Sequence, residues 1–262
     1  MDIVKAIIMG IVEGLTEFLP ISSTGHMILV GHIIHFEGKS ASVFEVVIQL
    51  GSMLAIAFLY WKRYVSLLNP ATLKKDNKRF NIIHVFLGIL PAGLVGVVFH
   101  DFIKTLFSPA YVLTFLILGA FLMIYADKKN KIITAETIDQ LTYMQSFKIG
   151  LFQIFAVLPG FSRAGSTISG GLLVGANPKT AAEFSFLIAL PVMIGATGLD
   201  LLKNIDIITG GNIPVFIVGF ITAFIVAMLA VVSFLKLLER VSLSAFAYYR
   251  ILLAVLFALF IL

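Results

Sequence analysis

Residues 13–26 read EGLTEFLPISSTGH, and they interrupt the first apolar segment of the chain, residues 3–35, in its middle. Proline lacks a backbone donor and ends a helix, so Pro20 leaves helical pieces of about 12–16 residues on either side. At 1.5 Å per residue such a piece reaches only about 18–24 Å, less than the roughly 30 Å core of a bilayer. The stretch therefore predicts a helix–loop–helix hairpin that enters a membrane and turns back.

A second apolar segment, residues 146–175, is broken in the same way by the sequence PGFSR at residues 159–163. Irregular backbone at membrane depth persists only where it is enclosed by protein or lines a watery cavity. We therefore interpret both segments as re-entrant hairpins whose tips line a cavity.

Composition indicates that a bilayer is the solvent of this chain. Of the 262 residues, 60% are hydrophobic, only 13% are charged and none is cysteine, whereas a soluble domain carries about 25% charged residues. The absence of cysteine excludes disulfides, thiolate metal sites and a cysteine nucleophile. The net charge of +5 does not indicate a nucleic-acid partner, because the basic residues cluster between the apolar runs, as in membrane loops.

Apolar runs of about 20 residues are long enough to cross the bilayer as helices. Such runs lie at residues 41–60, 81–100, 109–126, 180–200, 213–235 and 244–262. With the two hairpins they predict an all-α polytopic membrane protein with six transmembrane helices. All of these segments belong to a single transmembrane domain, residues 1–262.

The basic residues also predict the orientation of the helices. The gaps at residues 61–79, 127–148 and 236–240 hold most of the lysines and arginines. By the positive-inside rule these gaps are cytoplasmic. Counting crossings outward places both termini and the first hairpin on the outer side, whereas the second hairpin enters from the cytoplasm.

The two halves of the chain, residues 1–126 and 146–262, resemble each other weakly. The matching pairs are Gly10 with Gly150, Glu13 with Gln153, Ser22 with Ser162, Gly25 with Gly165, Leu50 with Leu190 and Met53 with Met193. Each half contains one hairpin and three crossings, and an odd number of crossings inverts the second half. Inverted repeats with broken helices place a functional site at mid-membrane between the repeats.

Two carboxylates in the first hairpin, Glu13 and Glu17, are four residues apart and share one helix face. Ionisable residues inside a membrane segment are expensive and indicate function. Such a pair can bind a divalent cation through its oxygen atoms or take part in general acid–base catalysis. The alternative is a pair near the helix end that the outer interface solvates.

A run of hydroxyl groups, Ser22, Ser23 and Thr24, follows the break, and His26 lies within one turn of Ser23. A serine with an imidazole in reach is the minimum for an activated nucleophile, and His26 could instead protonate a leaving group. The alternative is that the hydroxyls cap the next helix and that His26 bonds to a neighbour. We expect Ser23 to be catalytic and Ser22 and Thr24 to bind phosphate.

Arg163 lies at the tip of the second hairpin, where an unpaired guanidinium is costly. Arginine is the preferred bidentate partner of phosphate, and the helix N-termini that follow both breaks attract anions. Its neighbours add further phosphate donors: Ser162, Gly165, Ser166 and Thr167. The alternative is a structural ion pair with Glu13 or Glu17.

Other charged residues in the crossing helices are Glu45, Glu183 and Arg250. We expect them to form interhelical hydrogen bonds or ion pairs.

Residues 13–26 resemble the first signature of the bacterial undecaprenyl-diphosphatase family, the bacitracin-resistance membrane phosphatases. Residues 159–167 resemble its second signature, and AAEFSF at residues 181–186 is also similar to the family. The likeness covers nearly the whole chain. The family usually has SRSGAT where residues 162–167 read SRAGST, so the role of a hydroxyl at position 164 is put in doubt.

The resemblance implies hydrolysis of undecaprenyl diphosphate to undecaprenyl phosphate, which recycles the lipid carrier of peptidoglycan synthesis. It also implies bacitracin resistance, dependence on a divalent cation and an interdigitated inverted-repeat fold. We expect the cation to be Mg²⁺ or Ca²⁺, held by Glu13 and Glu17. The expected location is a bacterial inner membrane, with the pocket open to the outer side. Bacitracin is expected to compete for the substrate rather than to bind the protein, and homodimerisation is left open.

The resulting hypothesis has Arg163, the helix N-termini and a divalent cation neutralising the diphosphate while Ser23 attacks the terminal phosphorus and His26 assists proton transfer. Direct attack by water, with Ser23 only binding phosphate, is left open. The alternative function is a lipid-phosphate transporter or flippase, because inverted repeats and broken helices are transporter architecture. A second lipid-phosphatase family is rejected because no histidine follows Arg163 at the required distance.

Overall fold

The computed structural model describes residues 2–70, 79–129, 132–204, 206 and 213–262. Within these ranges the regular secondary structure is helical, and the extended pairing is a single bridge between Ala135 and Ala176. The all-α prediction is therefore confirmed.

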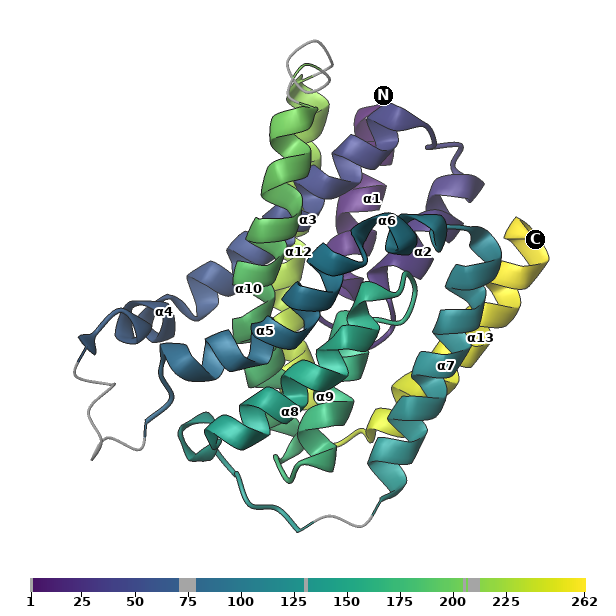
Figure 1. The fold of residues 1–262 in the computed structure, drawn as a ribbon. Helices are drawn as coiled ribbons and strands as arrows, with labels where there is room; N and C mark the ends of the chain where they lie inside the picture. The colour runs from purple at the N-terminus through teal and green to yellow at the C-terminus, as the bar shows by residue number, and fades with distance from the viewer. Residues whose placement is uncertain (1, 71–78, 130–131, 205, 207–212) are drawn as a thin grey trace.

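Helices occupy most of both halves of the chain (Figure 1). The first half comprises α1 (Ile3–Thr16), α2 (Ser23–Ile33), α3 (Lys39–Leu59), α4 (Trp61–Leu67), α5 (Ile82–Val98), α6 (His100–Thr105) and α7 (Pro109–Lys128). The second half comprises the 3-10 turn η2 (Ile138–Gln140), α8 (Tyr143–Gln153), the 3-10 turn η3 (Ile154–Val157), α9 (Arg163–Leu173), α10 (Pro178–Lys203), α12 (Ile213–Leu237) and α13 (Leu243–Ile261).

Five helices of the described chain are long and apolar enough to cross a membrane, namely α3, α7, α10, α12 and α13. Each lies within a few residues of a predicted crossing. The sixth predicted crossing, residues 81–100, corresponds to α5, which is shorter at 17 residues. It ends at Val98; Phe99 is non-helical at φ −106° and ψ 18°, and α6 begins directly afterwards.

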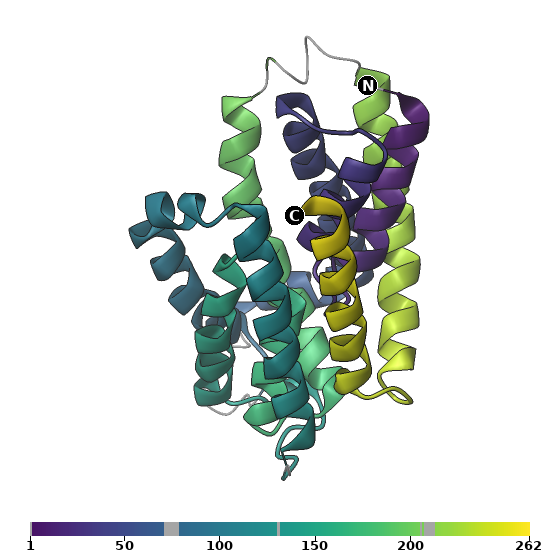
Figure 2. The same cartoon turned by 90° about the vertical axis from the view of Figure 1, so that its right-hand side faces the viewer.

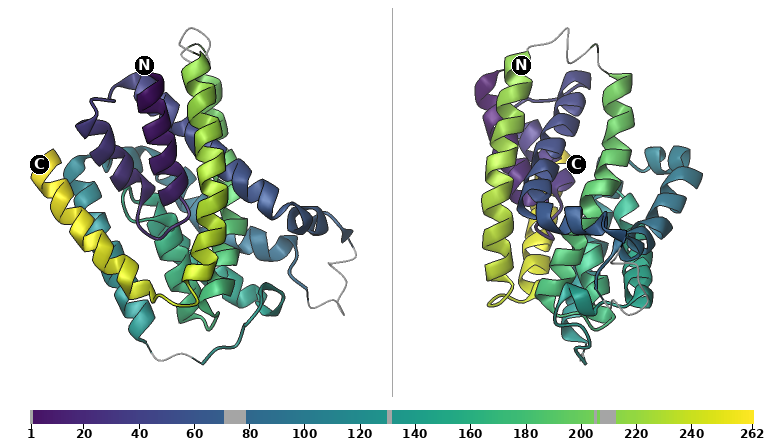
Figure 3. Two further views of the ribbon diagram at one scale, coloured as in Figure 1. Left: turned by 180° about the vertical axis from the view of Figure 1, so that it is seen from behind. Right: turned by 90° about the vertical axis from the view of Figure 1, so that its left-hand side faces the viewer.

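The two proline-broken segments form helix–loop–helix units at opposite ends of the molecule. In Figure 1, α1 and α2 lie in the upper half, and α8 and α9 lie in the lower half. The same arrangement is seen from behind in Figure 3, where the loop after α1 points toward the middle of the molecule. Both chain termini lie in the upper half of Figure 2. The two loops therefore approach each other from opposite directions.

Helices of the two halves are interleaved. The α1 helix packs on α12 and α8 packs on α5, so each hairpin rests on a helix of the other half. Small residues allow such close approaches in membrane proteins. A Cβ atom at Gly14 of α1 would lie 2.8 Å from the Ala223 carbonyl oxygen of α12, and one at Gly150 of α8 would lie 2.6 Å from the Leu87 carbonyl oxygen of α5.

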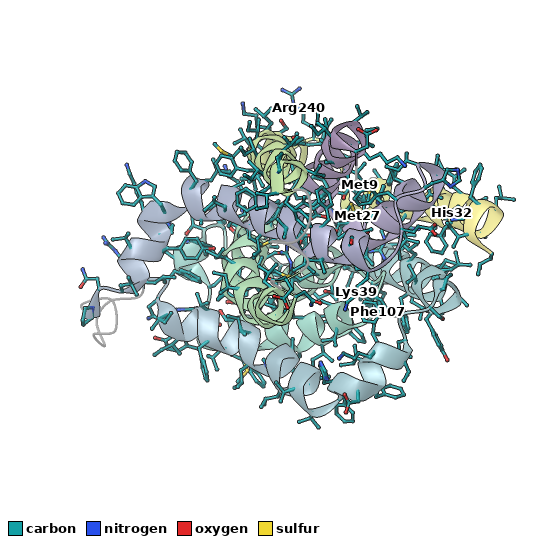
Figure 4. All side chains as sticks on the ribbon, turned by 90° about the horizontal axis from the view of Figure 1, so that it is seen from above. Met9, Met27, His32, Lys39, Phe107 and Arg240 are labelled. Atoms are coloured by element: carbon teal, nitrogen blue, oxygen red, sulfur yellow. The ribbon has the colours of Figure 1, made fainter. Side chains whose placement is uncertain are left out.

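The first hairpin is fixed by apolar packing as well as by its loop. Seen from above, Met9 of α1 and Met27 of α2 lie beside each other (Figure 4). Both are buried in one apolar cluster with Phe36 and Phe44. In a membrane segment such packing stabilises the fold through van der Waals contacts between side chains. This cluster anchors the hairpin against α3 and holds its tip in place.

Candidate active site

Two buried carboxylates lie at the end of α1. Glu13 is 2% exposed and Glu17 is 7% exposed. Glu17 directly follows the last residue of α1, and its backbone N–H still donates to the Glu13 carbonyl oxygen. The helical turn therefore places both side chains at the tip of the first hairpin.

Glu17 joins the two hairpins. Its Oε2 accepts a hydrogen bond from Ser23 Oγ at 2.7 Å, and its Oε1 accepts one from Arg163 Nη2 at 3.1 Å. The side chains of the Arg163–Glu17 ion pair are only 10% and 6% exposed. A serine hydroxyl that donates to a carboxylate is arranged for proton removal. The structure thus brings Glu17, Ser23 and Arg163 into one cluster, and the ion pair considered from the sequence is present.

Ser22 and Ser162 occupy equivalent positions in the two loops. Each is the N-cap of the following helix, with φ of 70° and 76°, and each side-chain oxygen accepts from the glycine three residues later. Few non-glycine residues adopt positive φ, and such strain concentrates at functional sites. The capping bond uses one acceptor site of each hydroxyl and leaves the hydroxyl hydrogen available to a ligand.

The start of each capped helix offers backbone donors. The first N–H groups of a helix have no intrahelical acceptor. Within the described part of the chain, no acceptor is recorded for the N–H groups of Ser23, Thr24, Arg163 and Ala164. Helix N-termini of this kind attract phosphate groups. Both N-termini start at the cluster formed by Glu17, Ser23 and Arg163.

Arg163 is held on several sides. Its Nη1 donates to the Ser185 carbonyl oxygen at 3.1 Å and to Ser185 Oγ at 3.2 Å. Its Cζ lies 5.7 Å from the centroid of the Phe18 ring, a cation–π distance. Thr167 Oγ1 lies 2.7 Å from Ser185 Oγ and extends this support into α9. The guanidinium therefore has a fixed orientation before any ligand binds.

The other predicted phosphate ligands occupy different places. Ser166 and Thr167 are fully buried, and both hydroxyls donate to the Arg163 carbonyl oxygen, so they support α9 from within. Gly165 N–H donates to Ser162. Thr24 is half-buried, and no side-chain hydrogen bond is recorded for it within the described chain. Of this group, Thr24 has the hydroxyl most available to a ligand.

His26 is buried but does not bond to Ser23. Its Nδ1 lies 2.8 Å from the Ser22 carbonyl oxygen, and its Nε2 lies 2.8 Å from the Tyr249 hydroxyl. The sequence suggested His26 as the partner that activates Ser23, whereas the recorded partner of Ser23 Oγ is Glu17. The reason is geometric, because the His26 ring turns toward α13.

The carboxylate pair fits a divalent cation. Glu13 Oε1 is buried and has no hydrogen-bond partner in the described chain. A buried carboxylate without a partner is costly, and a cation or a proton would remove that cost. Oxygen donors suit Mg²⁺ and Ca²⁺. The described residues contain no group of three or more histidine or acidic ligands, so substrate and water would complete the coordination of an ion held by Glu13 and Glu17.

Three contacting residues were not assigned to the site from the sequence, namely Ser185, Tyr249 and Arg250. Ser185 lies in the AAEFSF stretch, whose likeness to the family was the available signal. Arg250 is fully buried and donates to the carbonyl oxygens of Leu116 and Gly160, which confirms the expected interhelical hydrogen bonds. No feature of the sequence distinguished Tyr249.

Replacing Ser185 by alanine is expected to lower kcat, because it removes a hydroxyl that orients Arg163. Hydrogen bonds to charged groups contribute about 1.5–3 kcal/mol, which corresponds to roughly 10- to 100-fold in rate. The matched control is Ser169→Ala, since Ser169 is also fully buried but its hydroxyl has no partner in the described chain. Equal activity of the two variants in phosphate-release assays would contradict the proposed support of Arg163.

Comparison with known proteins places this geometry in a family. Residues 6–256 match the family described as "Bacitracin resistance protein BacA". The chain is 63% identical over 262 residues, 100% of this chain and 99% of each relative, to "Undecaprenyl-diphosphatase 1" of Bacillus thuringiensis subsp. konkukian (strain 97-27) and of Bacillus anthracis. The protein of that name from Bacillus thuringiensis (strain Al Hakam) is equally similar. Since both matches extend over nearly the whole chain, it belongs to the bacitracin resistance protein BacA family.

Proposed function

We propose that this protein is an integral membrane phosphatase that hydrolyses undecaprenyl diphosphate to undecaprenyl phosphate and phosphate. The observation that carries the proposal is the buried cluster in which Glu17 binds both Ser23 and Arg163. The full-length relatives are named for this activity. The reaction would recycle the lipid carrier of peptidoglycan synthesis and confer bacitracin resistance, with bacitracin competing for the substrate.

The diphosphate would bind between the two hairpin tips. Phosphoryl transfer demands chiefly positioning and neutralisation of charge. The Arg163 guanidinium would supply the positive charge. Unused N–H groups at the starts of α2 and α9 would donate to phosphate oxygens. Further donors would be the hydroxyls of Ser22, Thr24 and Ser162, while Gly165, Ser166 and Thr167 shape and support the second loop.

Ser23 would be the nucleophile. Its Oγ would form a bond to the terminal phosphorus while its proton passes to Glu17 Oε2, the present acceptor of that hydrogen bond. The bond from phosphorus to the bridging oxygen would break, and undecaprenyl phosphate would leave. Water would then hydrolyse the phosphoserine to release phosphate. Protonated His26 would give a proton to the leaving undecaprenyl phosphate, and neutral His26 would then take one from the attacking water while Glu17 returns its proton to Ser23.

Glu13 and Glu17 would hold a divalent cation, Mg²⁺ or Ca²⁺, which would neutralise phosphate charge when bound.

Chelation with EDTA is expected to abolish phosphate release, and added Mg²⁺ or Ca²⁺ should restore it. Glu13→Gln is expected to raise the cation concentration needed for half-maximal activity by about 10-fold or more, because one anionic ligand is lost. Cation binding measured by titration calorimetry should weaken in parallel. Glu183→Gln, a change on a crossing helix, serves as the control. If Glu13→Gln needs the same cation concentration as Glu183→Gln, the assignment of Glu13 as a ligand is wrong.

We also propose the membrane topology predicted from the sequence: α5 as a sixth crossing, two re-entrant hairpins, inverted repeats over residues 1–126 and 146–262, and a pocket open to the outer face of a bacterial inner membrane. The equivalent caps at Ser22 and Ser162 and the reciprocal packing of α1 on α12 and α8 on α5 support the repeat. The chain has no cysteine, so single cysteines can be labelled without background. An impermeant thiol reagent should label Lys39→Cys from outside intact cells but not Lys128→Cys.

The decisive experiment for the function uses purified protein in detergent. Release of phosphate from undecaprenyl diphosphate is expected, with Arg163→Ala as the inactive control. An enzyme needs no sealed membrane, whereas a transporter would release no phosphate. Absence of release, together with movement of lipid phosphate across vesicle membranes, would favour the transporter instead.

A further inference from the structure

The contact between His26 and Tyr249 joins residues 223 positions apart in the chain. The Tyr249 hydroxyl lies 2.8 Å from His26 Nε2, and the two rings are nearly parallel, with an interplanar angle of 8°. Tyr249 belongs to α13, whereas His26 belongs to α2 of the first hairpin. The last helix of the chain therefore reaches the first signature segment.

The two hydrogen bonds of His26 define the state of its ring. The Ser22 carbonyl oxygen can only accept, so Nδ1 must carry a hydrogen. In the neutral ring Nε2 is then an acceptor, and the Tyr249 hydroxyl donates to it. In the protonated ring Nε2 donates, and the same hydroxyl accepts. A tyrosine hydroxyl thus serves both protonation states of His26, which suits a group that gains and loses a proton.

An alternative reason for tyrosine in α13 is anchoring at the membrane interface, where tyrosine is common. The adjacent Tyr248 fits that role, because it is 56% exposed and no hydrogen bond is recorded for it in the described chain. Tyr249 is 44% exposed, yet its hydroxyl turns inward to a buried imidazole. Phenylalanine would fill the same space but could not form the hydrogen bond to His26 Nε2.

The next residue on α13 strengthens this interpretation. Arg250 Nη2 donates to the Gly160 carbonyl oxygen at 3.1 Å, in the loop of the second hairpin. Consecutive residues of α13 therefore contact the two hairpins separately, Tyr249 through His26 and Arg250 through Gly160. The α13 helix acts as a common support for both halves of the site.

We propose that Tyr249 is a positioning residue that fixes the orientation of the His26 ring, whose tautomer is set by the Ser22 carbonyl oxygen. The proposal rests on the proposed function, because it assigns Tyr249 a role only through proton transfer by His26. By bonding to Nε2, Tyr249 keeps the ring in the orientation in which Nδ1 donates to the Ser22 carbonyl oxygen. Nε2 is then the nitrogen that gains and loses a proton.

The test compares Tyr249→Phe with Tyr248→Phe, which removes the neighbouring hydroxyl without touching His26. Tyr249→Phe is expected to lower kcat roughly 3- to 10-fold with little change in KM, because one neutral hydrogen bond is lost while the phosphate ligands remain. Tyr248→Phe should match the unaltered protein. If Tyr249 acts through His26, adding Tyr249→Phe to His26→Gln should lower activity no further. If Tyr249→Phe lowers activity by the same factor in the unaltered protein and in His26→Gln, the proposal is wrong.

A spectroscopic readout is independent of activity. The chain has five histidines, so the ¹⁵N signals of His26 can be identified by their loss in His26→Gln. Tyr249→Phe should shift the His26 Nε2 signal, and Tyr248→Phe should not. An unshifted signal overturns the inference even if Arg163→Ala is inactive, whereas full activity of Arg163→Ala would instead refute the proposed site.

Discussion

Replacing Arg163 by alanine is expected to lower phosphate release from undecaprenyl diphosphate by about 10³-fold or more, the scale seen when a phosphate-binding arginine is removed from a phosphoryl-transfer site. Arg163 places its guanidinium at the meeting point of the hairpins, where it is already oriented by Ser185, Glu17 and Phe18. A preoriented charge needs no rearrangement as the transition state forms. Its loss should therefore appear in kcat.

The same substitution is expected to destabilise the protein. Removing one partner of a buried ion pair leaves the other charge uncompensated, at a cost of about 3–5 kcal/mol. The double variant Arg163→Ala/Glu17→Gln removes both charges and should recover much of the free energy of unfolding without recovering activity. Thermal unfolding and phosphate release measured on both variants separate the structural effect from the catalytic one.

Arg163→Lys is the matched control for charge alone. Lysine keeps the positive charge but cannot reproduce the planar fork that bonds both Ser185 and Glu17. Partial activity, well below that of the unaltered protein and above that of Arg163→Ala, is expected. Wild-type turnover in both variants would show that Arg163 serves only as the ion-pair partner of Glu17.

The hairpins could be predicted from the sequence because proline acts locally. In the first hairpin α1 ends at Thr16 and α2 begins at Ser23, on either side of Pro20. In the second hairpin, α8 ends at Gln153, several residues before the break predicted at Pro159, and the 3-10 turn η3 follows it. Leu158 is extended because the residue before proline avoids the helical region. The apolar residues between Gln153 and Pro159 gave no polar signal for the earlier helix end.

The site was predictable in its residue types but not in its pairings. Carboxylates, hydroxyls and an arginine within apolar segments indicated chemistry on their own, and the repeat indicated that the two tips would meet. Which acceptor Ser23 selects depends on side-chain rotamers, and the sequence placed His26 within one turn of Ser23 without pairing Ser23 with Glu17. Tyr249 comes from a helix at the far end of the chain, and periodicity alone does not distinguish it from Tyr248. Long-range contacts of single hydroxyl groups require the packed structure.

Ser23→Ala is expected to reduce turnover by about 10³-fold or more, the scale of losing a nucleophile. The hydrogen bond from Ser23 Oγ to Glu17 Oε2 is the observation behind this expectation, because it prepares the hydroxyl for loss of its proton. Ser169→Ala removes a buried hydroxyl that has no partner in the described chain and should retain full activity.

A labelled intermediate distinguishes the two chemical routes at Ser23. With undecaprenyl diphosphate radiolabelled in its terminal phosphate, acid quenching within one turnover should trap label on Ser23. Glu17→Gln should slow formation of that adduct, because the amide cannot take up the serine proton. If Ser23→Ala keeps near-normal turnover, the nucleophile assignment is wrong. A loss of only about 10-fold, without trapped label, is the size expected for one lost hydrogen bond to a charged ligand. That outcome would make Ser23 a phosphate ligand and water the attacking group, since Glu17 could accept a proton from water at the same place.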